Sequence, residues 1–124
     1  MTNIVESFKK IQLNINKINT DKIVNIIAVS KTFPIEHIQP LIDYGHLHFG
    51  ENKVQEASSK WTVIKKDNEN VKLHMVGKLQ SNKAKDAIKL FDYIHSLDNQ
   101  KLADNLSKHQ MNLGKQLKYF IQVN

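Results

Sequence analysis

The chain has 124 residues, of which 40% are hydrophobic and 24% charged, and 18 basic residues against 12 acidic ones give a formal charge of +6. This length fits one domain with a real core, since a chain of this size buries roughly two-thirds of the surface that it exposes when unfolded. The absence of cysteine excludes a disulfide scaffold, a cysteine zinc site and a cysteine nucleophile, and no apolar run approaches the ~20 residues of a membrane span.

All of the basic residues are lysines, and they are scattered along the chain. A positive charge favours anionic partners. Without arginine, however, the chain lacks the planar fork that reads guanine or grips phosphate with two hydrogen bonds, so nucleic acid is an unfavoured partner. The first ten residues, MTNIVESFKK, do not have the cationic and then apolar layout of a secretion signal. We therefore expect a cytoplasmic protein with no membrane partner.

Hydrophobic spacing predicts the first three elements. Apolar residues at helical intervals predict an amphipathic helix over 4–18. The short β-branched run 23–29 predicts a strand that is buried on both faces. Pro34 then begins a helix, where its missing N–H costs nothing, and Gly45 ends it. The inward face of this helix consists of Ile38, Leu41 and Ile42.

The alternation of strand and helix continues to the end of the chain. Further strands are predicted at 47–49, 73–76, 93–97 and 119–123. The inward faces of the helices between them are Val54, Ala57, Trp61 and Ile64, then Ala84, Ala87, Ile88 and Phe91, then Leu102, Ala103 and Leu106. Asp98 or Asn99 is predicted to cap the last of these helices.

Strict alternation of short strands and helices predicts an α/β fold of parallel βα repeats. Five such units account for about half of the ~250 residues of a closed eight-unit barrel, so the chain forms either half of a (βα)8 barrel or a small open doubly wound sheet. The sequence ends within a predicted strand. We therefore expect residues 1–124 to be a single truncated domain whose first and last strands are edges. Such edges predict a homodimer through these strands, domain swapping or aggregation.

Ligands of parallel α/β folds bind at the carboxyl ends of the strands, so the residues that follow each strand are the candidates for a site. Lys31 follows the first strand closely, and its stem is predicted to start in the interior layer of the sheet. Partial desolvation there would leave a usable fraction of neutral amine, which a Schiff-base lysine needs. The alternative is that Lys31 extends into solvent and has no chemical role.

Five segments, in order along the chain, carry a resemblance to one family. They are AVSKT at 28–32, FGENKVQE at 49–56, HMVGKLQSNK at 74–83, IHSLD at 94–98 and IQVN at 121–124. These segments resemble the signature of the pyridoxal 5′-phosphate homeostasis proteins, whose fold is similar to the N-terminal barrel of alanine racemase. The resemblance implies a non-catalytic protein that carries pyridoxal phosphate in vitamin B6 and amino-acid homeostasis. It also implies that Lys31 holds the cofactor as an aldimine.

The same resemblance suggests four further cofactor-binding residues, each with a structural alternative. Asn52 reaches the substituents of the pyridine ring, or it is the N-cap of the following helix. His74 lines the barrel interior near the cofactor, or it is a hydrogen-bonded core histidine. Ser81 and Asn82 lie near the cofactor, or they cap the helix that follows them.

Other parts of the family's site have no counterpart in this chain. The family holds the phosphate with a segment rich in serine and glycine in the later strands, and an arginine faces the pyridine nitrogen. This chain has no arginine and no glycine-rich loop. We therefore expect it to bind pyridoxal phosphate weakly, or only through non-specific bonds to lysines. Glu51 and Gln55 are expected to orient loops rather than to touch the ligand.

Three alternatives remain at this stage. An enzyme of the alanine-racemase type would need a second base, usually a tyrosine from another domain, and the sequence offers no candidate. A basic module that binds nucleic acid or a protein would leave Lys31 with a structural role only. His46 and His48 have strand spacing and lie near Glu51, but a zinc site wants a third firm ligand, so ordinary loop histidines are favoured.

Overall fold

Five strands and five α-helices follow one another along residues 4–18 and 24–123, which are the residues that the computed structural model describes. In chain order the elements are α1 (Ile4–Ile18), β1 (Ala28–Val29), α2 (Ile35–Tyr44), β2 (His48–Glu51), α3 (Val54–Asp67), β3 (Lys72–Met75), the 3₁₀ helix η1 (Ser81–Lys83), α4 (Ala84–Leu90), β4 (Tyr93–Leu97), α5 (Gln100–Leu113) and β5 (Lys118–Ile121). The strands pair in this order and all in parallel. The predicted α/β fold of parallel βα repeats is therefore confirmed.

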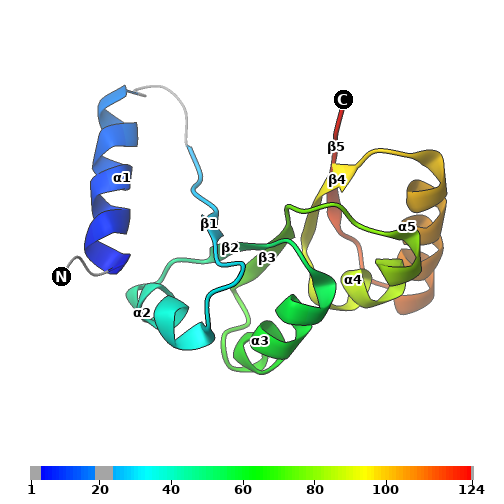
Figure 1. Cartoon of the computed structure of the whole chain (residues 1–124), viewed down its shortest axis with the longest axis horizontal. Helices are drawn as coiled ribbons and strands as arrows, with labels where there is room; N and C mark the ends of the chain where they lie inside the picture. The colour runs from blue at the N-terminus through cyan, green and yellow to red at the C-terminus, as the bar shows by residue number, and fades with distance from the viewer. Residues whose placement is uncertain (1–3, 19–23, 124) are drawn as a thin grey trace.

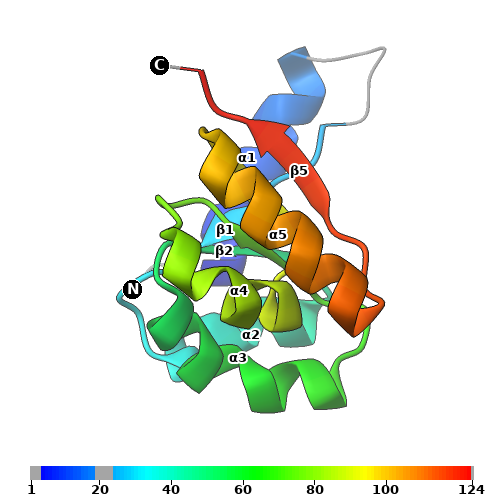
Figure 2. The same ribbon diagram turned by 90° about the vertical axis from the view of Figure 1, so that its right-hand side faces the viewer.

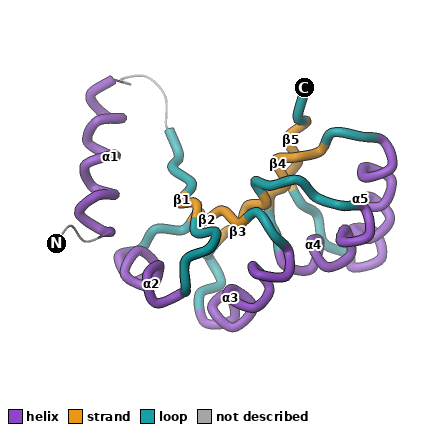
Figure 3. The backbone as a smooth tube through the Cα atoms, viewed as in Figure 1, coloured by secondary structure: helices purple, strands orange, loops and turns teal. Residues whose placement is uncertain are grey.

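The strands form a curved row, and α2 to α5 lie along its outer side (Figures 1 and 3). Figure 1 shows these four helices following one another in sequence order, and Figure 2 views them from the α5 end of the row. Helix α1 stands at the β1 end of the row, where Phe8 is buried against the rings of Tyr44 and His46. Among the described elements, no helix covers the inner side of the curve, which we call the concave face.

The hydrophobic core lies between the sheet and the outer helices. Phe49 pairs with Leu73 in register, and Met75 pairs with Ile94, so these four side chains alternate toward the same face of the sheet. All four are almost completely buried. Trp61 of α3 packs on Phe49, with a ring separation of 4.9 Å, which identifies this face as the helical one. The positions that alternate with these along the strands, among them His48, His74 and Tyr93, therefore point to the concave face.

The first strand is the element that the sequence predicts least well. A strand over 23–29 that is buried on both faces is wrong, because only Ala28 and Val29 pair with the sheet. Ile23 lies outside the described residues. Val29 is 49% exposed, because β1 has a neighbour on one side only and the concave face beside it is open.

The other boundaries agree within one or two residues. The helix over 4–18 and the strand over 93–97 are exact, and the predicted inward faces of α2 and α5 are buried at Ile38, Leu41, Ile42, Leu102 and Leu106. Gly45 ends α2 with φ +106°, a left-handed conformation that favours glycine. Asn99 caps α5, since its Oδ1 accepts a hydrogen bond of 2.8 Å from the N–H of Leu102.

Both ends of the sheet are edges. β1 pairs with β2 alone, and β5 pairs with β4 alone. The two edges carry exposed apolar side chains, among them Val29, Phe120 and Ile121. Across the described residues, no helix is both long enough and apolar enough to cross a membrane.

Candidate functional site

The carboxyl ends of β1, β2 and β3 meet at one end of the sheet. The N–H of Ser30 donates to the carbonyl of Gly50 over 2.8 Å, and the N–H of Val76 donates to the carbonyl of Glu51 over 2.9 Å. These two bonds extend the hydrogen-bond pattern of the β1–β2 and β2–β3 pairs just past the ends of the strands. The segments that follow, with Lys31, Asn52 and Gly77, therefore leave the sheet at the same end, as the sequence predicts for a ligand site.

Lys31 lies in a turn that begins directly after Ser30, and its side chain is exposed. The prediction that its stem starts in a buried layer of the sheet is wrong. The buried residue at this point is Ser30, which is 1% exposed, whereas β1 stops two residues before Lys31. The concave face that would shelter the amine is open in this chain, so the lysine reaches solvent at the edge of that face.

Asn52 does not cap a helix. The N-cap of α3 is Lys53, and no side chain caps this helix end. The Oδ1 atom of Asn52 is buried and has no hydrogen-bond partner among the described residues. A Cβ atom added to Gly77 would lie 2.6 Å from the carbonyl oxygen of Asn52, so a glycine is required where β3 passes the end of β2.

A hollow of about 630 Å³ opens at this end of the sheet, and we call it the strand-end hollow. Its polar lining consists of Asn52, Lys53, Gln55, Lys78, Gln80 and Lys83. Of the five predicted cofactor-binding residues, only Asn52 lines it. The hollow therefore joins the second strand end to the third, and it does not extend to Lys31.

Ser81 and Asn82 do not cap α4. Both belong to η1, and Lys83 is the N-cap of α4, with no side-chain hydrogen bond. Their backbone turns away from the strand end before the helix starts. Asn82 is exposed and Ser81 is half-buried, so the two residues lie beside the strand-end hollow without lining it.

His74 lies at the centre of a hydrogen-bonded row of three histidines on the concave face. Its Nε2 is 2.9 Å from Nδ1 of His48 on β2, and its Nδ1 is 2.8 Å from Nε2 of His95 on β4. Its ring stacks on Tyr93 at 4.2 Å, and the ring of His95 stacks on Phe120 at 4.6 Å. The alternative of a hydrogen-bonded core histidine is therefore confirmed, and the ring also lies on the concave face, while its proximity to the cofactor stays a prediction.

The histidine row (His48, His74 and His95) favours the neutral form of His74 and of His95. Each of the two nitrogen-to-nitrogen contacts needs one proton, so a neutral His74 donates in one contact and accepts in the other. His74 is 4% exposed. Burial, together with the charges that His95 and His48 would carry, lowers the pKa of His74 from 6.5 to about 4. Burial also lowers the pKa of His95.

A buried carboxylate stands behind the Lys31 turn. Glu51 is completely buried, and its Oε2 accepts hydrogen bonds from the Ser30 hydroxyl and, over 3.0 Å, from Nε1 of Trp61. The Nζ of Lys60 lies 2.9 Å from the same oxygen and neutralises its charge. Glu51 thus contacts the Lys31 turn through Oε2, whereas its buried Oε1 has no hydrogen-bond partner among the described residues. Gln55 is exposed and lines the strand-end hollow.

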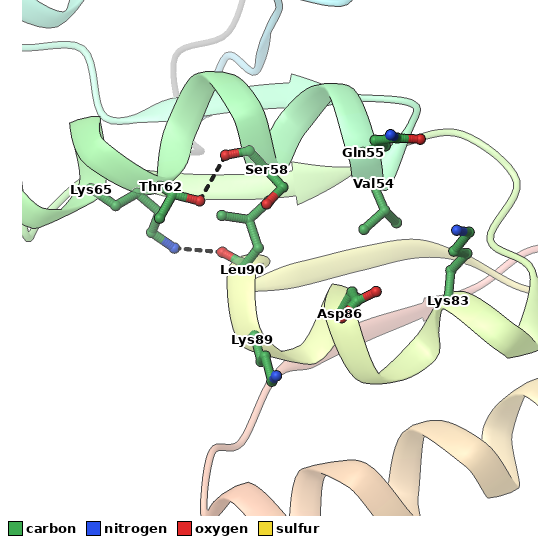
Figure 4. A pocket seen from close by; sticks show the side chains of 9 residues that line it. All are labelled: Val54, Gln55, Ser58, Thr62, Lys65, Lys83, Asp86, Lys89 and Leu90. Carbon is green, nitrogen blue, oxygen red and sulfur yellow. Dashed lines mark hydrogen bonds between the residues drawn. The ribbon is translucent and has the colours of Figure 1, made fainter.

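A second cavity, of about 680 Å³, lies between α3 and α4 on the outside of the molecule (Figure 4). It contains none of the predicted cofactor-binding residues. Lys65 at its edge donates from Nζ to the carbonyl of Leu90 and to Oδ2 of Asp92, both over 2.7 Å. Val54, Gln55 and Lys83 line both this cavity and the strand-end hollow, so the two adjoin there. The rest of the cavity lies between the two helices, on the outer side of the sheet, so we do not include it in the candidate site.

The described residues contain no group of three side chains that could hold a metal ion. The rings of His46 and His48 are 6.4 Å apart, and His48 is bonded to His74 instead. The interpretation of these two as ordinary loop histidines is wrong for His48, which lies on β2 and belongs to the histidine row. Burial lowers the pKa of His46, which favours its uncharged form.

The sequence interpretation missed several residues that organise this end of the fold. His48 and His95 were not connected with His74, and Lys60 and Glu56 of α3 were not connected with the Lys31 turn. The sequence contains a partial pattern for the pair of Glu56 and Lys60 and another for the three histidines. Glu56 and Lys60 have the spacing of a helical ion pair, and histidines recur in three of the predicted strands.

Known proteins share both the sequence and the fold of this chain. A protein of Pasteurella multocida named pyridoxal phosphate homeostasis protein is 40% identical over 101 residues, which are 82% of this chain and 43% of that protein. One of the same name from Buchnera aphidicola subsp. Baizongia pistaciae is 38% identical over 130 residues, which cover 100% of this chain and 56% of that protein. No family model matches the chain.

The structure of PipY from Synechococcus elongatus PCC7942 with pyridoxal phosphate bound matches this fold with a TM-score of 0.80 and 40% identity, over 91% of this chain and 53% of PipY. The chain spans about half the length of the curated relatives that it matches. Over the matched residues, the family resemblance and the partial-barrel fold predicted from the sequence are confirmed.

Proposed function

We propose that this chain, which matches the N-terminal portion of the pyridoxal phosphate homeostasis proteins, binds pyridoxal phosphate without catalysing a reaction of its own. Its relatives carry the name of homeostasis proteins rather than of enzymes, and PipY has been solved with the cofactor bound. The observation that carries the proposal is that the segments with Lys31 and Asn52 leave a parallel sheet at the same end. The cofactor would serve vitamin B6 and amino-acid homeostasis.

The residues present fit the cofactor. Lys31 offers an exposed primary amine, and pyridoxal phosphate supplies an aldehyde that forms a C=N bond with such an amine as water leaves. Asn52 offers a buried side-chain oxygen that lacks a partner in the described part of the chain. Among the other predicted residues, His74 would contribute to the wall of the barrel interior, and Ser81 and Asn82 to the rim.

The tyrosines support the non-catalytic role. A racemase-type reaction needs a second acid-base group that faces the lysine. The chain has three tyrosines, and each is engaged elsewhere. Tyr44 packs on Phe8, Tyr93 stacks on His74, and the hydroxyl of Tyr119 donates to Oε1 of Gln110 over 2.7 Å.

We further propose that residues 1–124 act as a single cytoplasmic domain that binds the cofactor weakly. A tightly held phosphate needs converging backbone N–H groups or arginine forks. The sequence has no arginine and only four glycines. Nucleic acid is not a proposed partner.

The exposed sheet edges support a homodimer. Val29 on β1 and Phe120 and Ile121 on β5 are 49%, 52% and 76% exposed, and both strands have unpaired backbone groups on one side. Light scattering over a hundredfold range of concentration tests this part of the proposal. A dimer is expected, and a monomer throughout the range would contradict it.

An absorbance titration tests the role of Lys31. Pyridoxal phosphate added to the chain should give the absorbance band of a lysine-bound cofactor, and the band should be lost in Lys31→Ala. The control is Lys101→Ala, since Lys101 is also an exposed lysine but lies on α5, outside the candidate site. An equal band in Lys31→Ala and in the unchanged chain would remove Lys31 from the proposal.

A further inference from the structure

The turn that carries Lys31 is held by hydrogen bonds on both sides of that residue. The carbonyl of Ser30 belongs to the peptide group just before Lys31, and the N–H of Thr32 belongs to the one just after it. Lys60 donates from Nζ to the Ser30 carbonyl over 2.6 Å, and Glu56 accepts from the Thr32 N–H over 2.7 Å. The backbone of Lys31 is therefore fixed at both of its peptide groups.

The two holding side chains come from one face of α3. Glu56 and Lys60 are four residues apart, and their charged groups lie 3.4 Å from each other. Lys60 is 11% exposed and also contacts the buried Glu51 carboxylate, whereas Glu56 is 28% exposed. The buried Glu51 carboxylate thus fixes the position of Lys60, and Lys60 in turn contacts Glu56 nearer the surface.

The turn needs this support. Thr32 has φ +66°, a left-handed conformation that is unfavourable for a β-branched residue. Such a conformation persists when several contacts from the surrounding structure hold the backbone in place. Two hydrogen bonds hold Thr32 here. The Glu56 carboxylate accepts from the Thr32 N–H, and the Phe33 N–H donates to the Ser30 carbonyl over 3.2 Å, which closes the turn.

We propose that Glu56 and Lys60 are positioning residues that present the amine of Lys31 to the aldehyde of the cofactor. This inference rests on the proposed function, because the position of the Lys31 amine matters only if Lys31 binds the cofactor. Neither residue touches the ligand. They act by restricting the backbone of Lys31, so the amine samples fewer directions before it reacts.

The test is the rate of covalent labelling of Lys31. The chain is mixed with pyridoxal phosphate, the C=N bond is reduced with borohydride at successive times, and peptide mass spectrometry measures the label on Lys31. Label on Lys101 and Lys108 in the same sample gives an internal reference, because both are exposed lysines of α5, far from the turn.

Glu56→Ala is expected to lower the Lys31 rate, relative to the reference lysines, by about tenfold, which corresponds to one charge-assisted hydrogen bond. Glu56→Gln should restore most of the rate, since its amide oxygen still accepts from the Thr32 N–H. Glu69→Ala, the control, removes an exposed carboxylate elsewhere and should change nothing. Lys60→Met should lower the rate, while Lys66→Met on the same helix should not.

The outcomes separate the two proposals. If Lys31 in the unchanged chain labels no faster than the reference lysines, the proposed function fails. If Lys31 labels preferentially and Glu56→Ala labels equally fast, the positioning role is wrong. A rate that falls in Glu56→Ala and is not rescued by Glu56→Gln also overturns the role, because charge and not the turn would then be responsible.

A further control shows whether a less stable protein, by itself, lowers the labelling rate of Lys31. Leu106→Ala removes a core side chain that is far from the turn, so it serves as a destabilised control. Its relative Lys31 rate should stay unchanged under conditions where the protein is folded. If Lys60→Met does not fold, Glu56→Ala decides the question, since it leaves the buried pair of Glu51 and Lys60 intact.

Discussion

The histidine row should make the stability of this protein depend on pH. The folded-state pKa of His74 is about 4, whereas its ordinary value is 6.5. Between pH 4 and pH 6.5, His74 is therefore protonated in the unfolded chain and neutral in the folded chain. The stability that His74 contributes is complete above pH 6.5 and falls as the pH drops toward 4.

The size of this effect follows from the shift. Each pKa unit corresponds to 1.36 kcal/mol, so His74 alone should lower the free energy of unfolding by about 3 kcal/mol between pH 7 and pH 4. That is a large part of the 5–15 kcal/mol typical of a folded domain. His46 and His95, whose pKa values are also lowered by burial, add to the loss in the same direction.

Urea unfolding at a series of pH values measures the effect. The free energy of unfolding of the unchanged chain should fall with decreasing pH between about 6.5 and 4. His74→Gln should remove about 1.36 kcal/mol per pH unit from that slope. His109→Gln, in which the histidine lies on α5 away from the row, should keep the slope. A flat profile in the unchanged chain, or a full slope in His74→Gln, would refute the reasoning.

Three substitutions test the packing that holds the strand ends, each by its urea midpoint. Asn99→Ala removes the cap of α5 and should cost about 1 kcal/mol, so an unchanged midpoint would contradict the cap. Trp61→Phe deprives the buried Glu51 of a donor and should cost about 1–3 kcal/mol; a neutral effect would mean that the bond is unimportant. Gly77→Ala brings a methyl group against Asn52 and should cost about 1–3 kcal/mol, whereas a stable variant would show that the close approach can relax.

The order of helices and strands could be predicted from the sequence because it depends on local patterns. Apolar residues at helical spacing identify the buried sides of α2 and α5, and each of these helices ends or begins at a residue with a specific backbone preference. Gly45 adopts a left-handed conformation and Asn99 caps a free N–H, and both effects act within a few residues.

The length and burial of β1 could not be predicted in the same way. The run 23–29 has the composition of a buried strand, but pairing and burial depend on what lies beside it in space. Val29 has a neighbouring strand on one side and an open concave face, so it is half exposed. The expectation of a buried Lys31 failed for the same reason.

The contacts of the candidate site join residues that are distant in the sequence. His48 meets His74 across 26 positions, and Lys60 meets Ser30 across 30. Such pairs depend on the register of parallel strands and on where α3 crosses the sheet. The family resemblance therefore named Lys31 and Asn52 as candidates, but neither it nor the local patterns identified Glu56 and Lys60, which hold the Lys31 turn.

The most direct test of the central claim is the distribution of bound cofactor among the 18 lysines of the unchanged chain. The chain is equilibrated with pyridoxal phosphate, reduced with borohydride and mapped by peptide mass spectrometry, so that each lysine receives its own occupancy. We predict that Lys31 has the highest occupancy of all, and that it saturates at the lowest cofactor concentration. An even distribution over the exposed lysines, with Lys31 no higher than the others, would contradict the account.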